Sequence, residues 1–339
     1  MRVDDLLQPP LTTDEDRRRA YRDDVYFRES ALRLGALEAA ERDRLLMRST
    51  FLVFKPEAVA GRRMGPALRY LSDRGFQVLG ACRVAFDART VRELWRYQLN
   101  AAPLPVVRAV DLIVAAGDCV FTALRDTRGP VPGGPPAAVR LSDLKGSSGD
   151  LEADRGRGLL REALGCVTQC LNFVHAPDEP ADLIRELGVL FAWPDLVRVL
   201  RLLAGPLREG AAAEVDALIR ELYDGHAAHH LDPAASRRAL RDAAAAHPQD
   251  AEMIADVLRA LDRDAPEEEL LRLIDWLERG TSAAQPWDRV TLASYLVANQ
   301  ESDRMPLIGP PPGERASARS ARVAAVAAER LPSADRSGR

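Results

Sequence analysis

Two hydrophobic periods divide the chain into strands and helices. Short apolar runs that end at turn residues predict strands, and apolar residues three or four apart predict amphipathic helices. In the middle of the chain these patterns predict strands over 50–54, 76–86 and 111–116, helices over 64–74 and 90–99, and a short helix near Phe121. Residues 171–191 then form a short apolar strand, a turn and an amphipathic helix. Helices that alternate with an antiparallel sheet indicate a ferredoxin-like α/β sandwich over residues 48–193.

Helical patterns flank this α/β region on both sides. Residues 12–16 place hydroxyls and acids at a helix start, and 26–46 carry apolar residues at helical spacing. We therefore expect an N-terminal helical extension over residues 1–47. Beyond Trp193, glycines and prolines separate further helical segments, over 195–203, 211–223, 235–245, 251–261, 267–277 and 287–298. They predict an all-helical domain over 194–303, followed by a disordered tail over 304–339 that is rich in Pro, Ala, Arg and Ser.

The composition is that of an ordinary soluble protein. The 339 residues are 47% hydrophobic and 29% charged, enough for two domains, and the net charge of −4 gives no reason to expect nucleic-acid binding. No apolar run approaches the roughly 20 residues of a membrane span, and the N-terminus has no apolar secretory core. The four cysteines, which form no Cys-x-x-Cys pairs, favour buried thiols in a reducing cytoplasm.

His175 is the strongest candidate for chemistry. It is the only histidine in the first 225 residues, and the pattern places it at the end of a short strand, with Glu186 on the helix that follows. A neutral imidazole there can attack a phosphoryl group, and a carboxylate can fix its tautomer through the other ring nitrogen. The alternative is a polar residue that closes the end of the sheet.

Lys55 ends the first predicted strand, because Pro56 cannot continue a central strand. Lysine occurs only here and at Lys145, while every other basic residue is arginine. A compact ammonium at a strand end suits contact with phosphate or sugar oxygens. The other interpretation is that a lysine occurs at this position by chance and has no function.

The segments around these two residues resemble the nucleoside diphosphate kinase family over residues 48–193. Lys55-Pro56-Glu57 is similar to the family's Lys-Pro-Asp motif. Asn172-Phe173-Val174-His175, followed by Asp178, is similar to its Arg-Asn-x-x-His-Gly-Ser-Asp motif, and Glu186 corresponds to the glutamate of the next helix.

The resemblance implies phosphoryl transfer from a Mg²⁺-bound nucleoside triphosphate through phosphohistidine to a nucleoside diphosphate. The implied catalytic residues are His175, Lys55, Glu186 and Tyr97, and the implied nucleotide-binding residues are Lys55, Leu104, Arg140, Ser148, Arg161 and Asn172. Mg²⁺ would be carried by the nucleotide, without a metal site of the protein. The resemblance also suggests a homo-oligomer, and the added helical domain suggests a protein partner.

Two departures from the family pattern leave other functions open. Pro177 replaces a serine that links the histidine and the glutamate, and Leu104 replaces a phenylalanine that stacks on the base. The segment 127–158 is also longer than the family needs. A kinase of the same fold with a different acceptor, and a non-catalytic nucleotide-binding interaction protein, are therefore alternatives.

A histidine cluster, His226, His229 and His230, is the other group with metal-ligating residue types. His226 and His230 are four residues apart, but no helix-borne glutamate completes a zinc-protease pattern. We expect a solvated cluster near a helix start. The chain also lacks a P-loop and a dinucleotide-binding glycine pattern, so nucleotide binding would need another geometry.

Overall fold

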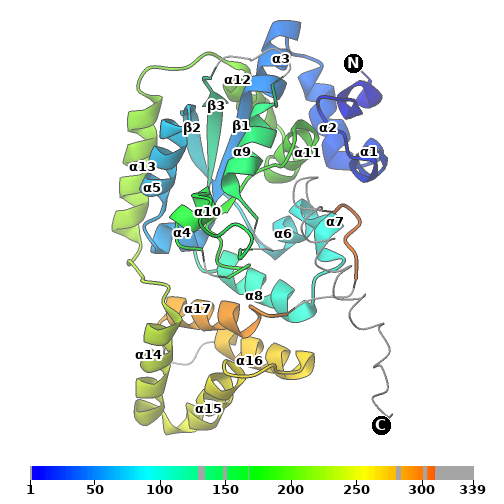
Figure 1. Cartoon of the computed structure of the whole chain (residues 1–339). Coiled ribbons are helices and arrows are strands. Elements are labelled where there is room, and N and C mark those ends of the chain that lie inside the picture. Colours follow the sequence, from blue (N-terminus) through cyan, green and yellow to red (C-terminus); the bar gives the residue numbers. More distant parts are fainter. Residues whose placement is uncertain are drawn as a thin grey trace, which may run out of the picture.

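The computed structural model describes residues 2–128, 134–147, 151–166, 168–279, 284–300 and 304–309. A four-stranded antiparallel sheet with the order β2-β3-β1-β4 lies in the upper part of the molecule (Figure 1). Its strands are β1 (Ser49–Phe54), β2 (Phe76–Val84), β3 (Cys119–Asp126) and β4 (Val174–His175). Helices separate all consecutive strands, and this strand order is that of a ferredoxin-like α/β sandwich. The predicted fold class is confirmed.

The helices fall into four groups along the chain. Those before the sheet are the 3₁₀ helix η1 (Val3–Leu7), α1 (Glu15–Arg22), α2 (Val25–Leu34) and α3 (Ala39–Arg48). Between strands lie α4 (Pro56–Ala60), α5 (Met64–Asp73), α6 (Ala88–Leu94), α7 (Arg96–Leu99), α8 (Leu104–Val114), α9 (Ala137–Lys145) and α10 (Leu160–Ala163). After β4 come α11 (Pro180–Leu190), α12 (Asp195–Ala204) and α13 (Ala211–Gly225). The last group is α14 (Pro233–Ala246), the 3₁₀ helix η2 (Pro248–Asp250), α15 (Ala251–Ala260), α16 (Glu267–Arg279) and α17 (Pro286–Leu296).

Two of the predicted elements are wrong. Residues 111–116, predicted as a strand, form the end of α8 and the turn after it, and the segment around Phe121, predicted as a short helix, is strand β3. Both segments are short apolar runs, for which periodicity does not separate a buried strand from a buried helix. The prediction therefore had the right number of strands but placed the third one about ten residues too early.

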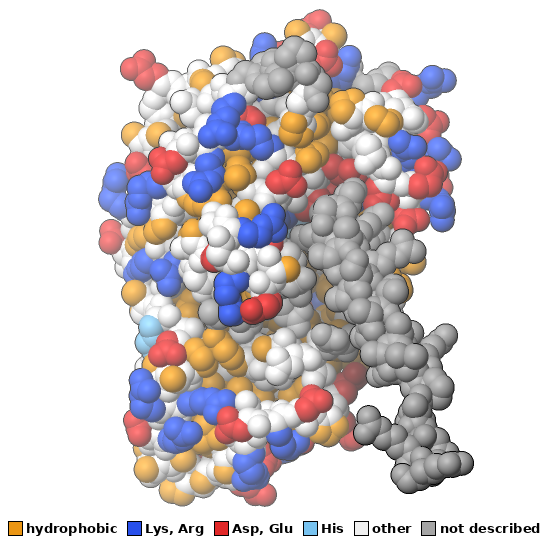
Figure 2. Space-filling model, in the orientation of Figure 1, with side chains coloured by type: hydrophobic (Ala, Val, Ile, Leu, Met, Phe, Trp, Pro, Cys, Tyr) orange, Lys and Arg blue, Asp and Glu red, His pale blue; other side chains and the backbone are white. Residues whose placement is uncertain are grey.

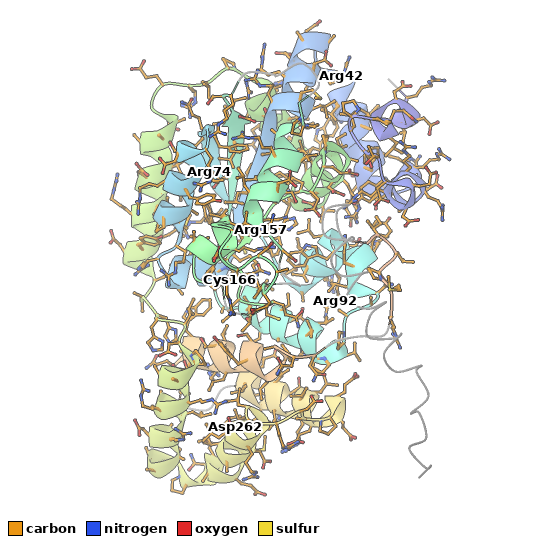
Figure 3. The ribbon with its side chains drawn as sticks, viewed as in Figure 1. Arg42, Arg74, Arg92, Arg157, Cys166 and Asp262 are labelled. Carbon is orange, nitrogen blue, oxygen red and sulfur yellow. The ribbon has the colours of Figure 1, made fainter. Side chains whose placement is uncertain are left out.

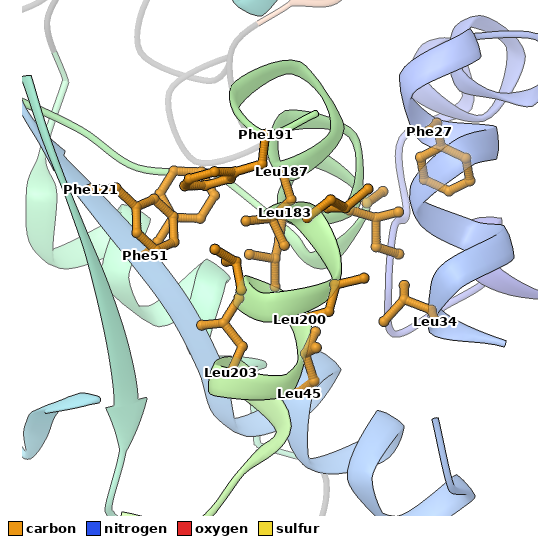
Figure 4. Close-up of a cluster of buried hydrophobic side chains, with 14 of the residues drawn as sticks. Phe27, Leu34, Leu45, Phe51, Phe121, Leu183, Leu187, Phe191, Leu200 and Leu203 are labelled. Atoms are coloured by element: carbon orange, nitrogen blue, oxygen red, sulfur yellow. The ribbon is translucent and has the colours of Figure 1, made fainter. Parts of the chain in front are cut away.

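Strand β1 divides the hydrophobic core into two layers. All six of its residues are buried. Phe51 and Val53 face the cluster built by α2, α3, α11 and α12, whereas Leu52 and Phe54 face the cluster built by α5, α9 and α13. Figure 4 shows the first cluster, where aromatic rings from the sheet meet leucines of the surrounding helices. Because successive side chains of a strand point to opposite faces, a continuous apolar run is what a sheet covered on both faces requires.

The helices after residue 193 pack in two different places. α12 joins the first cluster and α13 lies along β2, so both cover the sheet. The helices α14–α17 form a third cluster below it, which also contains Ala109 and Ile113 of α8 (Figure 1). The packing thus favours a helical lobe that begins near α14, while the boundary at residue 194 remains a prediction. None of the described helices is long and apolar enough to cross a membrane.

The start of the predicted disordered tail is packed against the protein. Ile308 is fully buried in the first cluster, and its N–H donates to the Tyr97 carbonyl at 3.1 Å. Asn100 holds the same segment through the Met305 carbonyl and the Leu307 N–H. Residues 310–339, the remainder of that prediction, lie outside the described residues.

Close contact between α2 and α11 depends on Gly188. A Cβ atom at this position would lie 2.5 Å from the Tyr26 carbonyl oxygen and 2.8 Å from the Ser30 hydroxyl. We expect Gly188→Ala to lower the free energy of unfolding by about 1–3 kcal/mol, because the two helices must separate. Denaturant unfolding of the full chain measures this loss.

Gly225→Ala is the matched control for this substitution. Gly225 is also helical, but a Cβ atom there meets nothing within 4 Å. Alanine should leave the stability unchanged or raise it through its helix propensity. Equal effects of the two substitutions would contradict the packing argument.

Candidate functional site

A histidine–carboxylate pair lies at the end of the sheet. His175 pairs with Val53 across the antiparallel β1–β4 ladder, so its ring lies on the face covered by α11. Glu186, on that helix, places Oε2 2.7 Å from the Nε2 atom of His175. Both side chains are about nine-tenths buried. Among the described residues, Nδ1 of the same ring has no hydrogen-bond partner, so one nitrogen is held and the other is available for chemistry.

Burial raises the pKa of the Glu186 carboxyl, although the nearby His175 acts in the opposite direction. A carboxylate that is costly to ionise gains from accepting the Nε2–H of the histidine. This hydrogen bond selects the tautomer whose lone pair is on Nδ1. The pair therefore has the geometry that an imidazole nucleophile requires.

Aromatic side chains form the walls around His175. The Trp95 ring meets the imidazole edge-on, with centroids 5.3 Å apart and an interplanar angle of 82°, and Phe51 lies 6.4 Å away. Tyr97, named from the sequence, instead donates its hydroxyl hydrogen to Asp24 at 3.0 Å. Trp95 is thus the aromatic neighbour that sequence reasoning missed. Its position at the junction of α6 and α7, where the helical phase is broken, concealed it.

Lys55 ties the end of β1 to the segment that leads into β4. Its Nζ atom lies 2.8 Å from Oε1 of Glu57 and donates to the Cys170 carbonyl at 2.9 Å. The same Glu57 oxygen accepts the Phe173 N–H, and the Lys55 N–H donates to the Phe173 carbonyl. Asn172 lies in this segment and donates to the Gln169 carbonyl. The structure therefore brings Lys55 and Asn172 to the end of the sheet that carries His175.

Two further cations flank the histidine loop. Arg161 on α10 donates to the Val174 carbonyl at 3.1 Å, next to His175, and to the Gly146 carbonyl at 2.7 Å. Lys145 at the end of α9 donates to the Ala176 carbonyl at 2.9 Å and to Asp178 at 3.0 Å. Sequence reasoning assigned no role to Lys145. The feature of the sequence that could have pointed to Lys145 is its rarity, since it is the second of only two lysines in the chain.

The remaining predicted nucleotide-binding residues lie apart from this group. Arg140 pairs with Asp126 at 2.5 Å and lies over the Phe76 ring. Those partners belong to the first residue pair of the β2–β3 ladder, at the other end of the sheet, so the structure does not bring Arg140 to His175. Leu104 is 58% exposed in the first turn of α8. Ser148 lies outside the described residues.

A buried arginine of helix α1 contacts the acidic residues that follow His175. Arg17 is 2% exposed at its side chain and lies within 4 Å of four carboxylates, those of Asp14, Asp178, Glu179 and Asp182. The Asp14 side chain also caps α1, so the sequence that starts this helix fixes the arginine in place. The N-terminal helices are thereby part of the structure that holds the site.

The histidine cluster is divided by the fold. His229 and His230 stack beside Asp288, with Nε2 of His229 3.1 Å from that carboxylate, whereas His226 binds the Leu222 carbonyl. The Nδ1 atoms of His229 and His230 accept backbone N–H groups two residues ahead. Each neutral ring therefore carries its proton on Nε2, which suits a hydrogen bond from His229 to Asp288 better than metal ligation.

Comparison with known proteins agrees with the resemblance, and the matches cover just under half of the chain. No family model matches the chain. The nucleoside diphosphate kinase of Syntrophotalea carbinolica is 26% identical over 151 residues, which cover 44% of this chain and 100% of that protein. This part of the chain resembles nucleoside diphosphate kinases. The enzyme of that name from Methanoculleus marisnigri is 28% identical over 158 residues, which cover 46% of this chain and 95% of the relative.

Solved structures with this name cover the same share of the chain. The nucleoside diphosphate kinase of Aquifex aeolicus has a TM-score of 0.35 and 21% identity, covering 43% of this chain and 96% of its own. The NDP kinase of Pyrobaculum aerophilum has a TM-score of 0.34 and 18% identity, with coverages of 44% and 98%. Each of these matches leaves more than half of the present chain uncovered.

The Arg17 cluster makes stability depend on pH. Burial, reinforced by Asp182, raises the pKa of Glu179 from 4.5 to about 7. The folded state therefore keeps a proton that the unfolded state loses, and this stabilising contribution disappears as the pH rises from about 4.5 to 7. One pKa unit corresponds to about 1.4 kcal/mol, so Glu179→Gln should remove a pH-dependent loss of at most about 3 kcal/mol.

Chemical unfolding at several pH values between 5 and 8 measures this effect. The stability of the Glu179→Gln variant relative to the original chain should increase with pH. The amide retains the acceptor oxygen that the Thr12 hydroxyl uses. Parallel pH curves for the two proteins would show that Glu179 is ionised throughout this range.

Proposed function

We propose that this chain is a phosphotransferase that uses His175 as its nucleophile, with a nucleoside diphosphate as the acceptor. The observation that carries the proposal is the buried pair of His175 and Glu186, whose hydrogen bond leaves Nδ1 available. The similarity of this region to proteins named nucleoside diphosphate kinase supports the same reaction.

The reaction has two balanced steps. In the first, Nδ1 of His175 attacks the γ-phosphorus of a nucleoside triphosphate, the bond to the β,γ-bridging oxygen breaks, and the diphosphate leaves. In the second, a terminal oxygen of another nucleoside diphosphate attacks the phosphohistidine, and the N–P bond breaks. Glu186 accepts the Nε2–H throughout and stabilises the positive charge that develops on the imidazole.

Positive charge around the histidine loop would neutralise the transferring group. Phosphoryl transfer depends mainly on positioning and on electrostatic stabilisation of charge spread over the phosphoryl oxygens. Lys55, Arg161 and Lys145 supply this charge, and each is now bonded to a carboxylate or a carbonyl near residues 170–178. Asn172 adds an amide donor. Mg²⁺ would enter with the triphosphate as part of the substrate.

A different acceptor is the second candidate, and one feature of α8 favours it. This helix begins with the exposed Leu104, where the resembled family has an aromatic ring, and it packs against the C-terminal lobe through Ala109 and Ile113. Leucine offers apolar area but no π-face for a base. Association into oligomers, a protein partner for the helical region and a cytoplasmic location stay predictions.

Intact-mass measurement after incubation with Mg-ATP tests the proposal. We expect an acid-labile gain of one phosphoryl group in the original chain and none in His175→Ala. His230→Ala is the matched control, because that exposed imidazole lies in the separate cluster beside Asp288. Glu186→Gln should slow formation of the adduct by about 10²-fold, since the amide can still accept the Nε2–H but carries no charge to stabilise the positive imidazole.

Transfer from the phosphorylated chain to a panel of nucleoside diphosphates then separates the two acceptors. Discharge by these nucleotides supports the first candidate. A stable adduct that no nucleoside diphosphate discharges supports the second. Absence of any adduct, with ATP binding shown by calorimetry, would overturn the nucleophile and with it the proposed function.

A further inference from the structure

A cavity lined by three arginines lies at the other end of the sheet from His175. Its volume is about 260 Å³, and its lining residues are Arg44 and Arg48 of α3, Arg125 of β3, Thr127 and Leu207. Arg125 pairs with Ser49 at the start of β1, whereas His175 pairs with Val53 near its end. In Figure 1 this region is the top of the molecule, where α3, α12 and the start of β1 meet. The cavity is therefore separate from the candidate active site.

Three guanidinium groups converge on this cavity, and all their partners are neutral. Arg125 donates to the Ser49 hydroxyl at 3.0 Å and to two carbonyls, those of Leu203 and Gly205, at 2.8 Å. Arg44 donates to the Ala204 carbonyl at 2.8 Å, and Arg48 donates twice to the Asp126 carbonyl.

The three arginines also have no counter-ion among the described residues. In the described part of the chain, no carboxylate lies within 4 Å of their nitrogens. The nearby Asp126 offers Arg48 only its backbone carbonyl, because its carboxylate pairs with Arg140. The Nη1 atom of Arg125 has no hydrogen-bond acceptor in that part of the chain. Elsewhere on the molecule, both acidic and basic side chains are exposed on the visible face (Figure 2). The cavity is thus a local concentration of unbalanced positive charge.

Burial makes this concentration of positive charge energetically unfavourable. Arg125 is 7% exposed. Burial, together with repulsion from Arg44 and Arg48, lowers the pKa of Arg125 to about 10. Like charges that share a poorly hydrated site repel one another strongly, and a bound anion would reverse the sign of that interaction.

The partial negative charge at the C-terminus of α12 balances only part of the positive charge of the three arginines. The carbonyls of residues 203–205 lie at the C-terminus of this helix, where cations are favourable. A helix end carries the equivalent of only about half a negative charge, whereas three full positive charges gather here. Roughly two or more units of positive charge therefore remain without compensation.

We propose that this cavity binds a small anion that carries a phosphate group. Guanidinium groups bind phosphate oxygens through paired N–H donors, and Arg44, Arg48 and Arg125 retain N–H groups that no described residue uses. Pockets for drug-sized ligands measure roughly 300–1,000 Å³, so this cavity suits inorganic phosphate or a small phosphate ester better than a nucleotide. The bound anion would join α3, β3 and the end of α12. The inference does not depend on the role of His175.

Calorimetric titration of the full chain with inorganic phosphate, at constant ionic strength, tests the proposal. We expect saturable binding that weakens about tenfold or more in Arg44→Gln and in Arg48→Gln, because each loses a charged hydrogen bond to the anion. Both side chains are only partly buried, so these variants should fold. If one does not, the phosphate-induced rise in melting temperature of the other gives the same comparison.

Arg42→Gln is the matched control, since it removes the same charge from the same helix but does not line the cavity. Arg42 is labelled beside α3 in Figure 3. It should bind phosphate like the original chain, as should His175→Ala. Tighter binding of ribose 5-phosphate than of inorganic phosphate would identify an organic phosphate as the ligand, and equal binding would identify the free anion.

Three results would overturn the proposal. The first is a titration of the original chain that shows no binding of phosphate. The second is equal weakening in the cavity variants and in Arg42→Gln, which would indicate a general effect of net charge. Finally, loss of binding in His175→Ala would place the phosphate at the candidate active site, and the arginines would then serve only to cap α12.

Discussion

The short ladder between β1 and β4 sets the position of the His175 ring relative to Glu186. It consists of two residue pairs, Val53 with His175 and Phe54 with Val174. A slip of one residue would turn the histidine to the opposite face of the sheet, away from Glu186. Two pairs alone are a weak constraint on register, so the contacts around the strand must supply the rest.

Those contacts come from the segments on either side of β4. Lys55 and Glu57 hold the backbone of Phe173, and Arg161 and Lys145 hold the carbonyls of Val174 and Ala176. The charges that the proposed phosphoryl transfer would use are therefore the same ones that fix the backbone around His175.

The parts of the site that could be predicted from the sequence are those fixed by local chain geometry. The pair of His175 and Glu186 depends on one strand, one turn and one helix, and Lys55 depends on a proline that ends its strand. The prediction failed where distant segments decide the outcome. Trp95 and Tyr97 differ by two residues at a helix junction; Trp95 meets the imidazole, whereas Tyr97 bonds to Asp24, which precedes it by 73 residues.

The fold shows the same division. The two-sided burial of β1 follows directly from its continuous apolar run. The position of the third strand could not be predicted in this way, because residues 111–116 and 119–126 are both short and apolar. Which of them is a strand depends on which pairs with β1 and β2. Arg17 was equally hidden, since its four carboxylate neighbours come mostly from a segment more than 160 residues away.

The region that resembles the kinases is not a self-contained folding unit in this chain. Its sheet is covered on one face by α11 together with α2, α3 and α12, and on the other in part by α13; apart from α11, these helices lie before or after the segment of resemblance, residues 48–193, which α3 overlaps only at its last residue. Its helix α8 has Ala109 and Ile113 buried beneath the C-terminal lobe. A fragment cut at the limits of the resemblance would expose apolar surface on every side and would be prone to aggregate. The added helices are therefore structural components of the part that resembles the kinases, because they bury its apolar faces.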